Sequence, residues 1–458
     1  MAGYKISRIP QKVPPVATSH RLIQTDIPAP GTADILARLD AFESRSMHGQ
    51  LPLVWDRAED FSVYDMAGNR WIDFTSTIFV ANVGHSNTKV TMAMRAALDR
   101  PLYGCYAYAN ETRARYLEKL VTFAGAPFEK AFLLSAGTEA TEAALKLMRM
   151  YGQKLGKRRR GIICIEGNWH GRTLGAQMMS GNVAQREWVG YQDADIHHIP
   201  FPYPWGLDGN SGEAFLEKGL KKLENSGIDM EQDICGFMLE TFQGWGAVFY
   251  PESFVQAIEG VCRKFNILLA FDEMQAGFGR TGKAFGFQHY GVVPDLICCG
   301  KGMGAGVPLS GVLGRAEVMD LPDVGSMSST HSANPLVCAA GLAVLEEIEE
   351  RNLIAETARK GNVLSDALHS LQAQFPDRIL SVLGRGLIAA VLFRDPKTGG
   401  PDGIFASSVA ERCMQKGLLV VHTGRESIKI GPPLTITDEG LMEGVGVFGE
   451  AIAEVLSK

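Results

Sequence analysis

Six short apolar runs, separated by helix-like stretches, constrain the fold of this chain most strongly. The runs lie at residues 132–134, 162–165, 237–239, 267–271, 296–299 and 309–313, and helical patterns such as 138–150 and 254–265 stand between them. This alternation predicts an α/β protein with a mostly parallel sheet between layers of helices. In such sheets ligands bind beyond the carboxyl ends of the strands.

Two of these runs are each followed by a charged residue. Asp272 ends the run 267–271, and Lys301 follows the run 296–299 between two glycines. Burial favours the neutral, nucleophilic form of lysine, and an aspartate can keep a pyridine nitrogen protonated. Together they are what a protein contributes to pyridoxal phosphate (PLP) chemistry. An unrelated surface lysine and strand-end aspartate explain the same two residues equally well.

Composition narrows the class of protein and its partners. The chain has 458 residues, 46% of them hydrophobic, and a net charge of -6, with its densest basic patch at 157–160. No broad basic surface for nucleic acid is expected, and no apolar run approaches the roughly 18 residues of a membrane span. Eight cysteines without CxxC spacing are typical of a reducing cytoplasm, and no group of residues has zinc spacing. We therefore expect a cytoplasmic protein that binds neither nucleic acid, membrane nor metal.

Changes in composition suggest three segments. Residues 1–74 combine a proline-rich arm with a hairpin over 61–74, and we assign them to a smaller domain. Residues 75–340 hold the alternating pattern and form a large cofactor-binding domain. Residues 341–458, with predicted helices at 350–374 and 438–457, form the rest of a small α+β domain.

Three polar motifs carry candidate binding residues. Gly137 and Thr138 open a predicted helix, where free N–H groups suit a phosphate, although plain N-capping by Thr138 explains the motif as well. Trp169 follows a predicted strand and could stack on a flat ring. Thr330 lies in a polar loop and could donate to a phosphate. The glycine pattern of 277–282 matches a dinucleotide fingerprint, but it lacks the helix and acid that should follow, so we reject NAD binding.

These motifs stand in an order that resembles a known family. From about residue 50 onward the chain is similar to class III aminotransferases of the fold type I PLP superfamily, the ornithine, 4-aminobutyrate and ω-amino acid group. The resemblance implies a large α/β domain with a mostly parallel seven-stranded sheet between helices, and a smaller α+β domain. The motifs that carry the resemblance are 65–73, 84–85, 135–140, 170–173, 272–275, 277–282, 301 and 330–335.

The resemblance implies an aminotransferase that moves an amino group from a primary amine or ω-amino acid to a keto acid or aldehyde by a ping-pong mechanism. It implies that Lys301 forms an aldimine with pyridoxal 5'-phosphate and shuttles a proton. Asp272 would bind the pyridine nitrogen and Gln275 the ring hydroxyl. The remaining implied cofactor contacts are Gly137, Thr138, Trp169, His170 and Thr330. Because Thr330 would reach the neighbouring subunit's phosphate, the resemblance also implies a homodimer with shared sites, or a tetramer built from it.

The substrate side departs from the family pattern. Lys429 stands where relatives that use glutamate usually have an arginine, and Trp245 stands where an acid is common. Lysine is a point charge and not a bidentate fork. Candidate substrate residues are Phe79, Arg172, Glu240, Trp245 and Lys429, which suggest a partly aromatic pocket. A lyase or decarboxylase on the same scaffold would keep every cofactor residue and stays open.

Overall fold

The computed structural model describes residues 4–49, 51–207 and 209–457. The chain forms two compact units. The small unit contains residues up to 87, then 245–247, and 355 onward; the large unit contains 88–244 and 248–354. The domain limits predicted from the sequence, 74/75 and 340/341, stay a prediction.

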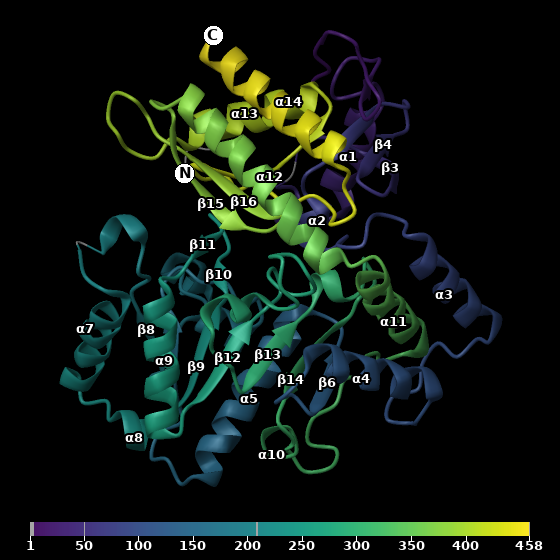
Figure 1. Ribbon diagram of the computed structural model, residues 1–458. Coiled ribbons are helices and arrows are strands. Elements are labelled where there is room, and N and C mark those ends of the chain that lie inside the picture. The colour runs from purple at the N-terminus through teal and green to yellow at the C-terminus, as the bar shows by residue number, and fades with distance from the viewer. Residues whose placement is uncertain (1–3, 50, 208, 458) are drawn as a thin grey trace. The chain divides into compact units, whose positions relative to one another are not determined.

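A seven-stranded sheet forms the centre of the large unit (Figure 1). The strand order is β6 (Lys130–Leu134), β14 (Ser310–Gly314), β13 (Leu296–Cys299), β12 (Leu268–Asp272), β9 (Ile234–Glu240), β7 (Gly161–Ile165) and β8 (Ile196–Ile199). All neighbours are parallel except β14, which is antiparallel to both β13 and β6. The predicted α/β class and mostly parallel sheet are confirmed. Strand β8 was missed because its two central histidines interrupt the apolar pattern.

Helix α5 (Gly137–Lys154) packs along one face of this sheet. Alternate strand residues such as Cys164, Met238 and Ala270 form one buried core with Ala144 and Met148 of the helix. The residues between them point to the opposite face, as strands with two covered faces require. The other helices of the large unit are α3 (Thr88–Asp99), α4 (Glu111–Ala124), α6 (Leu174–Met179), α7 (Gly212–Asn225), α8 (Met230–Asp233), α9 (Glu252–Phe265), α10 (Ala316–Met319) and α11 (Pro335–Glu350).

The small unit joins the two ends of the chain. Its first sheet has the order β1 (Val16–Ala17), β2 (Leu22–Ile23), β5 (Arg70–Asp73), β4 (Ser62–Asp65) and β3 (Trp55–Glu59), and β17 (Leu418–Leu419) adds to β5 in parallel. Its second sheet has the order β15 (Ile379–Arg385), β16 (Ile388–Phe393), β19 (Ser427–Ile430) and β18 (Val421–His422). The helices are α1 (Thr32–Phe42), α12 (Leu353–Gln374, from Ala355 onward), α13 (Gly403–Gln415) and α14 (Asp438–Leu456). Buried Trp71 donates its ring N–H to the carbonyl of Met414 at 2.7 Å, so the first hairpin shares a core with α13.

A left-handed turn follows the hairpin. All four residues of α2 (Ser76–Phe79) have positive φ, with values of 46°, 52°, 61° and 69°. The left-handed conformation costs an L-amino acid roughly 1–2 kcal/mol of free energy per residue, so it persists only where contacts with neighbouring residues stabilise it. The hydroxyl of Ser76 donates to the carbonyl of Gly431 at 2.6 Å, and the side chain of Thr75 accepts from the N–H of Thr77 at 3.1 Å.

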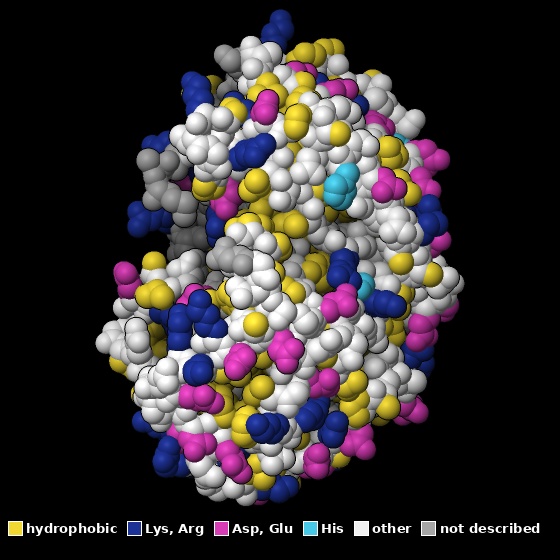
Figure 2. Space-filling view, turned by 60° about the vertical axis from the view of Figure 1, so that its left-hand side comes forward, with side chains coloured by type: hydrophobic (Ala, Val, Ile, Leu, Met, Phe, Trp, Pro, Cys, Tyr) yellow, Lys and Arg dark blue, Asp and Glu magenta, His cyan; other side chains and the backbone are white. Residues whose placement is uncertain are grey.

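The surface carries charges of both signs. Figure 2 shows basic and acidic side chains interspersed over one face of the molecule. Among the helices of the described chain, none combines the length and apolarity needed to span a membrane.

Candidate active site

The predicted acid and amine lie at the ends of neighbouring strands. Asp272 is the last residue of β12 and pairs in register with Cys298 of β13. Lys301 begins the short 3-10 helix η5 (Lys301–Met303), two residues after β13. On the other side of β12, strand β9 ends at Glu240, which is in register with Asp272. Three charged side chains therefore leave adjoining strands at one edge of the sheet.

Lys301 has the features of a nucleophilic lysine. Burial lowers the pKa of its ammonium, and the negative charges of Asp272 and Glu240 offset this only in part. Its backbone is strained, with a φ of 46°. A Cβ on the preceding Gly300 would lie 2.6 Å from the sulfur of Met274, so a larger residue would shift this turn.

Asp272 is fixed by two contacts. Its Oδ2 lies 2.9 Å from Nδ1 of His170, and its Oδ1 accepts the N–H of Met274 at 3.1 Å. His170 is held in turn, because its N–H donates to Ser180 Oγ and its carbonyl accepts from Thr141 Oγ1. Among the residues that the structure describes, the buried Nε2 of His170 has no hydrogen-bond partner. The aspartate can thus present only a narrow range of directions to a ligand.

The N-terminus of α5 forms the other end of the candidate site. Its N-cap is Ala136, so N-capping by Thr138 is ruled out; the Thr138 hydroxyl instead lies 2.6 Å from that of Thr173. Glu139 Oε2 accepts the N–H groups just before the helix, and the N–H of Glu139 itself donates to the carbonyl of Ala136. Among the described residues the N–H groups of Gly137 and Thr138 have no acceptor, so these two are left for a ligand. A Cβ on Gly137 would lie 2.8 Å from the sulfur of Met274. The sulfur of this one methionine thus limits the size of residues at both ends of the site.

Glu240 connects two other candidate residues. Its Oε2 accepts the backbone N–H of Trp169 at 2.9 Å, and its Oε1 accepts the side-chain amide of Gln275 at 3.4 Å. The indole of Trp169 is 37% exposed, and the guanidinium carbon of Arg172 lies 4.4 Å from its ring centre. Sequence reasoning missed this connection, because Glu240 ends a strand while Trp169 and Gln275 lie in two separate loops, and their spacing has no periodic signal.

The remaining substrate candidates lie in the small unit. The ammonium of buried Lys429 lies 4.6 Å from the ring centre of Phe79. The guanidinium carbon of Arg425 lies 3.8 Å from the ring of Trp245, whose carbonyl accepts from Ser427 at 2.8 Å. Each aromatic side chain is therefore paired with a cation of β19 or of the loop before it.

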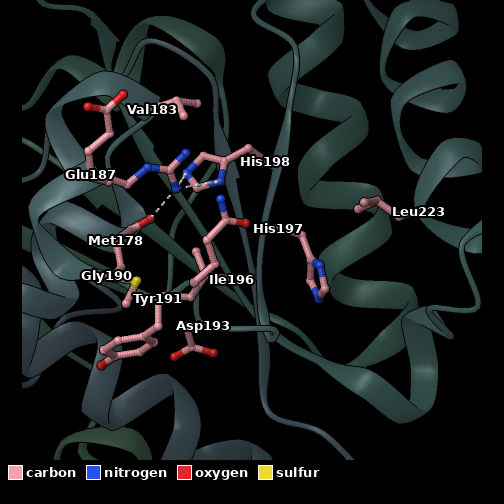
Figure 3. A pocket seen from close by; sticks show the side chains of 12 residues that line it. Met178, Val183, Glu187, Gly190, Tyr191, Asp193, Ile196, His197, His198 and Leu223 are labelled. Carbon is pink, nitrogen blue, oxygen red and sulfur yellow. Dashed lines mark hydrogen bonds between the residues drawn. The ribbon is translucent and has the colours of Figure 1, made fainter.

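The pocket drawn in Figure 3 is a different place. It has a volume of about 570 Å³ and lies along β8, the edge strand of the large sheet. His197 and His198 point to different sides of it (Figure 3). None of the predicted site residues lines it, so we do not connect it with the chemistry above.

The residues at the carboxyl edge fit PLP. Lys301, with its lowered pKa, can react with the aldehyde of the cofactor. Asp272, fixed by His170, can bind the ring nitrogen, and the N–H groups at the start of α5 can bind the phosphate.

Comparison with known proteins agrees with this geometry. The family model described as aminotransferase class-III matches residues 44–452. A probable 4-aminobutyrate aminotransferase of Bacillus subtilis is 33% identical and covers 91% of this chain and 97% of its own. A leucine/methionine racemase of Thermococcus litoralis is 35% identical and covers 88% of this chain and 91% of its own. The crystal structure of ornithine aminotransferase from Toxoplasma gondii has a TM-score of 0.82 at 26% identity, covering 93% and 96%.

The fold and the site define a PLP-dependent enzyme of fold type I. The chain belongs to the class III aminotransferases, and it transfers amino groups.

Proposed function

We propose that this aminotransferase takes its amino group from an ω-amino acid or a related primary amine, using Lys301 and Asp272 of the large unit as its chemical groups. The observation that carries the proposal is the placement of both residues on adjoining strand ends, the amine with a lowered pKa and the acid fixed by His170. Relatives named for 4-aminobutyrate support the donor class.

PLP, when bound, supplies an electron sink for charge that develops at the carbon bearing the donor's amino group. As a neutral amine, Nζ of Lys301 can attach the cofactor and can take and return the proton of that carbon. Asp272, held by His170, would keep a proton on the ring nitrogen. Gly137 and Thr138, at the N-terminus of α5, would hold the phosphate, Trp169 would stack on the ring, and Gln275 would bind the ring hydroxyl.

The cations of the small unit suit the carboxylate of an ω-amino acid. Lys429 is buried against Phe79, where a charge is poorly hydrated, so its attraction for a carboxylate is stronger than at the surface. It cannot form the two parallel hydrogen bonds of an arginine. We infer that Lys429 binds the carboxylate of the donor. Arg425, which is stacked on Trp245, is a second cation that could attract this carboxylate.

A matched pair of donors tests this proposal. We expect 4-aminobutyrate to react with a kcat/KM about 10- to 100-fold above that of butylamine, the size of a hydrogen bond to a charged group. In Lys429→Ala this preference should vanish while butylamine turnover stays. Equal rates for both donors in the native enzyme would contradict the role of Lys429.

Transfer itself is tested with the donor alone. In the absence of an acceptor the enzyme should convert one equivalent of bound PLP to pyridoxamine phosphate and release one carbonyl product. A donor that is released unchanged except for its configuration, or that loses carbon dioxide or another fragment, would instead indicate a racemase, a decarboxylase or a lyase.

We also propose a homodimer with shared active sites. Thr330 is exposed in the loop between α10 and α11, and this loop lines a hollow of about 470 Å³ together with Tyr106. Several large apolar side chains are exposed in these two segments. Val324 lies on the same loop as Thr330, and Leu102, Tyr103, Tyr106 and Tyr108 lie in the segment around Tyr106. Exposed apolar surface of this kind usually marks an interface.

Mixed dimers test the shared site. If Thr330 serves the partner's cofactor, a dimer of one Lys301→Ala chain and one Thr330→Ala chain should retain one fully native site. Half of the native activity is then expected, although each parent variant is impaired. Mixed dimers no more active than the average of the two parents would contradict the shared site.

A further inference from the structure

We propose that Glu240 is a positioning residue for the cofactor, which rests on the proposed function: its ionised carboxylate holds Trp169 and Gln275, the two residues assigned to the cofactor ring. The sequence suggested a substrate contact for this residue. Its place in the structure, at the end of β9 and buried, assigns it another role.

Among the described residues, the hydrogen-bond partners of the Glu240 carboxylate are all N–H donors, and none is an acceptor. The N–H of Trp169 lies 2.9 Å from Oε2, the N–H of Gly244 lies 3.4 Å from the same oxygen, and the amide nitrogen of Gln275 lies 3.4 Å from Oε1. A carboxylate is an acceptor at both oxygens, whereas a carboxylic acid must donate from one. Protonation would therefore set an O–H against an N–H and release one of these contacts.

The side-chain amide of Gln275 lies close to the backbone of Gly244, where there is no room for a Cβ. A Cβ on Gly244 would lie 2.4 Å from the amide nitrogen of Gln275 and 3.0 Å from Oε1 of Glu240. The amide is thus confined between the glycine and the carboxylate. Gly244 is also the last residue of the large unit before Trp245 enters the small unit, so the same carboxylate anchors the start of a segment with a substrate candidate.

The charges around Glu240 place its protonation near neutral pH. Burial and the neighbouring charge of Asp272 together raise the pKa of Glu240, His170 and the N–H groups of Trp169 and Gly244 lower it in part, and the result is a pKa of about 7. Two other titratable groups face it, since its charge raises the pKa of Lys301 and that of Tyr250. A drop in pH through about 7 should then release the contact at whichever oxygen takes the proton, and so weaken the hold on Trp169 or on Gln275.

Glu273 offers a matched control. It is also fully buried, and burial likewise raises its pKa to about 7. Like Glu240, its carboxylate acts only as a hydrogen-bond acceptor. Its donors are the hydroxyl of Thr241 and the N–H groups of Gly286 and Phe287, none of which is assigned to the cofactor. Loss of either carboxylate disturbs a buried network, but only Glu240 should affect the cofactor ring.

The experiment compares holoenzymes of the native protein, Glu240→Gln and Glu273→Gln across pH 5.5 to 8.5 (roughly 1.5 pH units on each side of a pKa of about 7). The measurements are the dissociation constant of PLP and the induced circular dichroism of the bound cofactor. In the native enzyme and in Glu273→Gln we expect both to change with a midpoint near 7. In Glu240→Gln we expect this midpoint to disappear, with PLP bound about tenfold more weakly at the alkaline end, the size of one lost hydrogen bond.

Two outcomes would overturn the inference. One is a Glu240→Gln enzyme with the native dissociation constant and pH profile; the other is the same change in Glu273→Gln. Reduction of the native holoenzyme with borohydride and peptide mapping keeps the two proposals apart. Cofactor found on Lys301 with an unchanged Glu240→Gln refutes the positioning role alone, whereas cofactor found elsewhere refutes the proposed site.

Discussion

The buried carboxylate of Glu273 should make the stability of the cofactor-free protein fall as pH rises from about 4.5 to about 7. Burial raises the pKa of this group, since hydrogen bonds from Thr241, Gly286 and Phe287 compensate only partly for lost hydration. The folded state consequently holds its proton up to a higher pH than the unfolded state does. Stability is lost through this window and becomes level above it, where both states are ionised.

The magnitude follows from the two pKa values. A rise from 4.5 to about 7 corresponds to about 3 kcal/mol between low and high pH. Glu273→Gln cannot ionise, so it should lack this loss. Its amide presents one acceptor to three donors, and we expect a constant penalty of about 1–3 kcal/mol at every pH. The variant should thus be less stable than the native protein by up to about 2 kcal/mol at pH 5, and equal to it or up to about 2 kcal/mol more stable at pH 8, so that the difference moves in favour of the variant as pH rises.

Urea denaturation of the cofactor-free protein at pH 5, 6, 7 and 8 measures this difference (pH values spanning the window from 4.5 to about 7). Protein concentration must be the same throughout, because association would shift the apparent stability. Glu231→Gln, which changes an exposed carboxylate, serves as the control and should follow the native profile. A free-energy difference between the native protein and Glu273→Gln that is the same at pH 5 and pH 8 would refute the reasoning.

Three further predictions concern the site. Asp272→Asn should lower kcat by about 10²–10³ without releasing the cofactor, because the ring nitrogen loses its charged partner; native kcat would exclude the assignment. Gly137→Ala should weaken PLP binding because its Cβ meets the sulfur of Met274, and Met274→Ala added to it should restore binding, which a titration of PLP would reveal. Trp245→Ala should change the order of preference among amine donors far more than it changes the affinity for PLP; a donor panel with the same ranking as the native enzyme would count against a substrate role.

Local patterns predicted most of the large sheet. The strands that give rise to Asp272 and Lys301 are continuous apolar runs, which is why both their existence and the end of each could be read from the sequence. Strand β8 has two histidines at its centre, and β15 (Ile379–Arg385) is mostly half-buried, with Ser381 and Gly384 among its apolar residues, so neither has a continuous apolar run.

Features that depend on distant neighbours could not be predicted. The left-handed turn at Ser76–Phe79 follows from contacts with residues such as Gly431, and an apolar sequence has no preference for it. The contact of His170 with Asp272 and the contacts of Glu240 likewise join loop residues to the ends of strands that are distant in sequence. The sequence identified His170, Asp272 and Glu240 as candidate site residues, but which residues they contact could be seen only in the structure.

The small unit has a consequence for how the chain is synthesised. Its strand β5 pairs with β17, and its left-handed turn is held by Gly431, so the N-terminal 87 residues lack these partners until residues 418–431 have left the ribosome. At about 5–20 residues per second, that wait lasts roughly 20–70 s. The large unit, made in between, can fold meanwhile. A nascent chain stalled before residue 418 would therefore leave β5 without β17 at Ile72 and Asp73, although β5 can still pair with β4, and would leave the indole of Trp71 uncovered by α13. An open strand edge and an exposed indole both invite chaperone binding or aggregation.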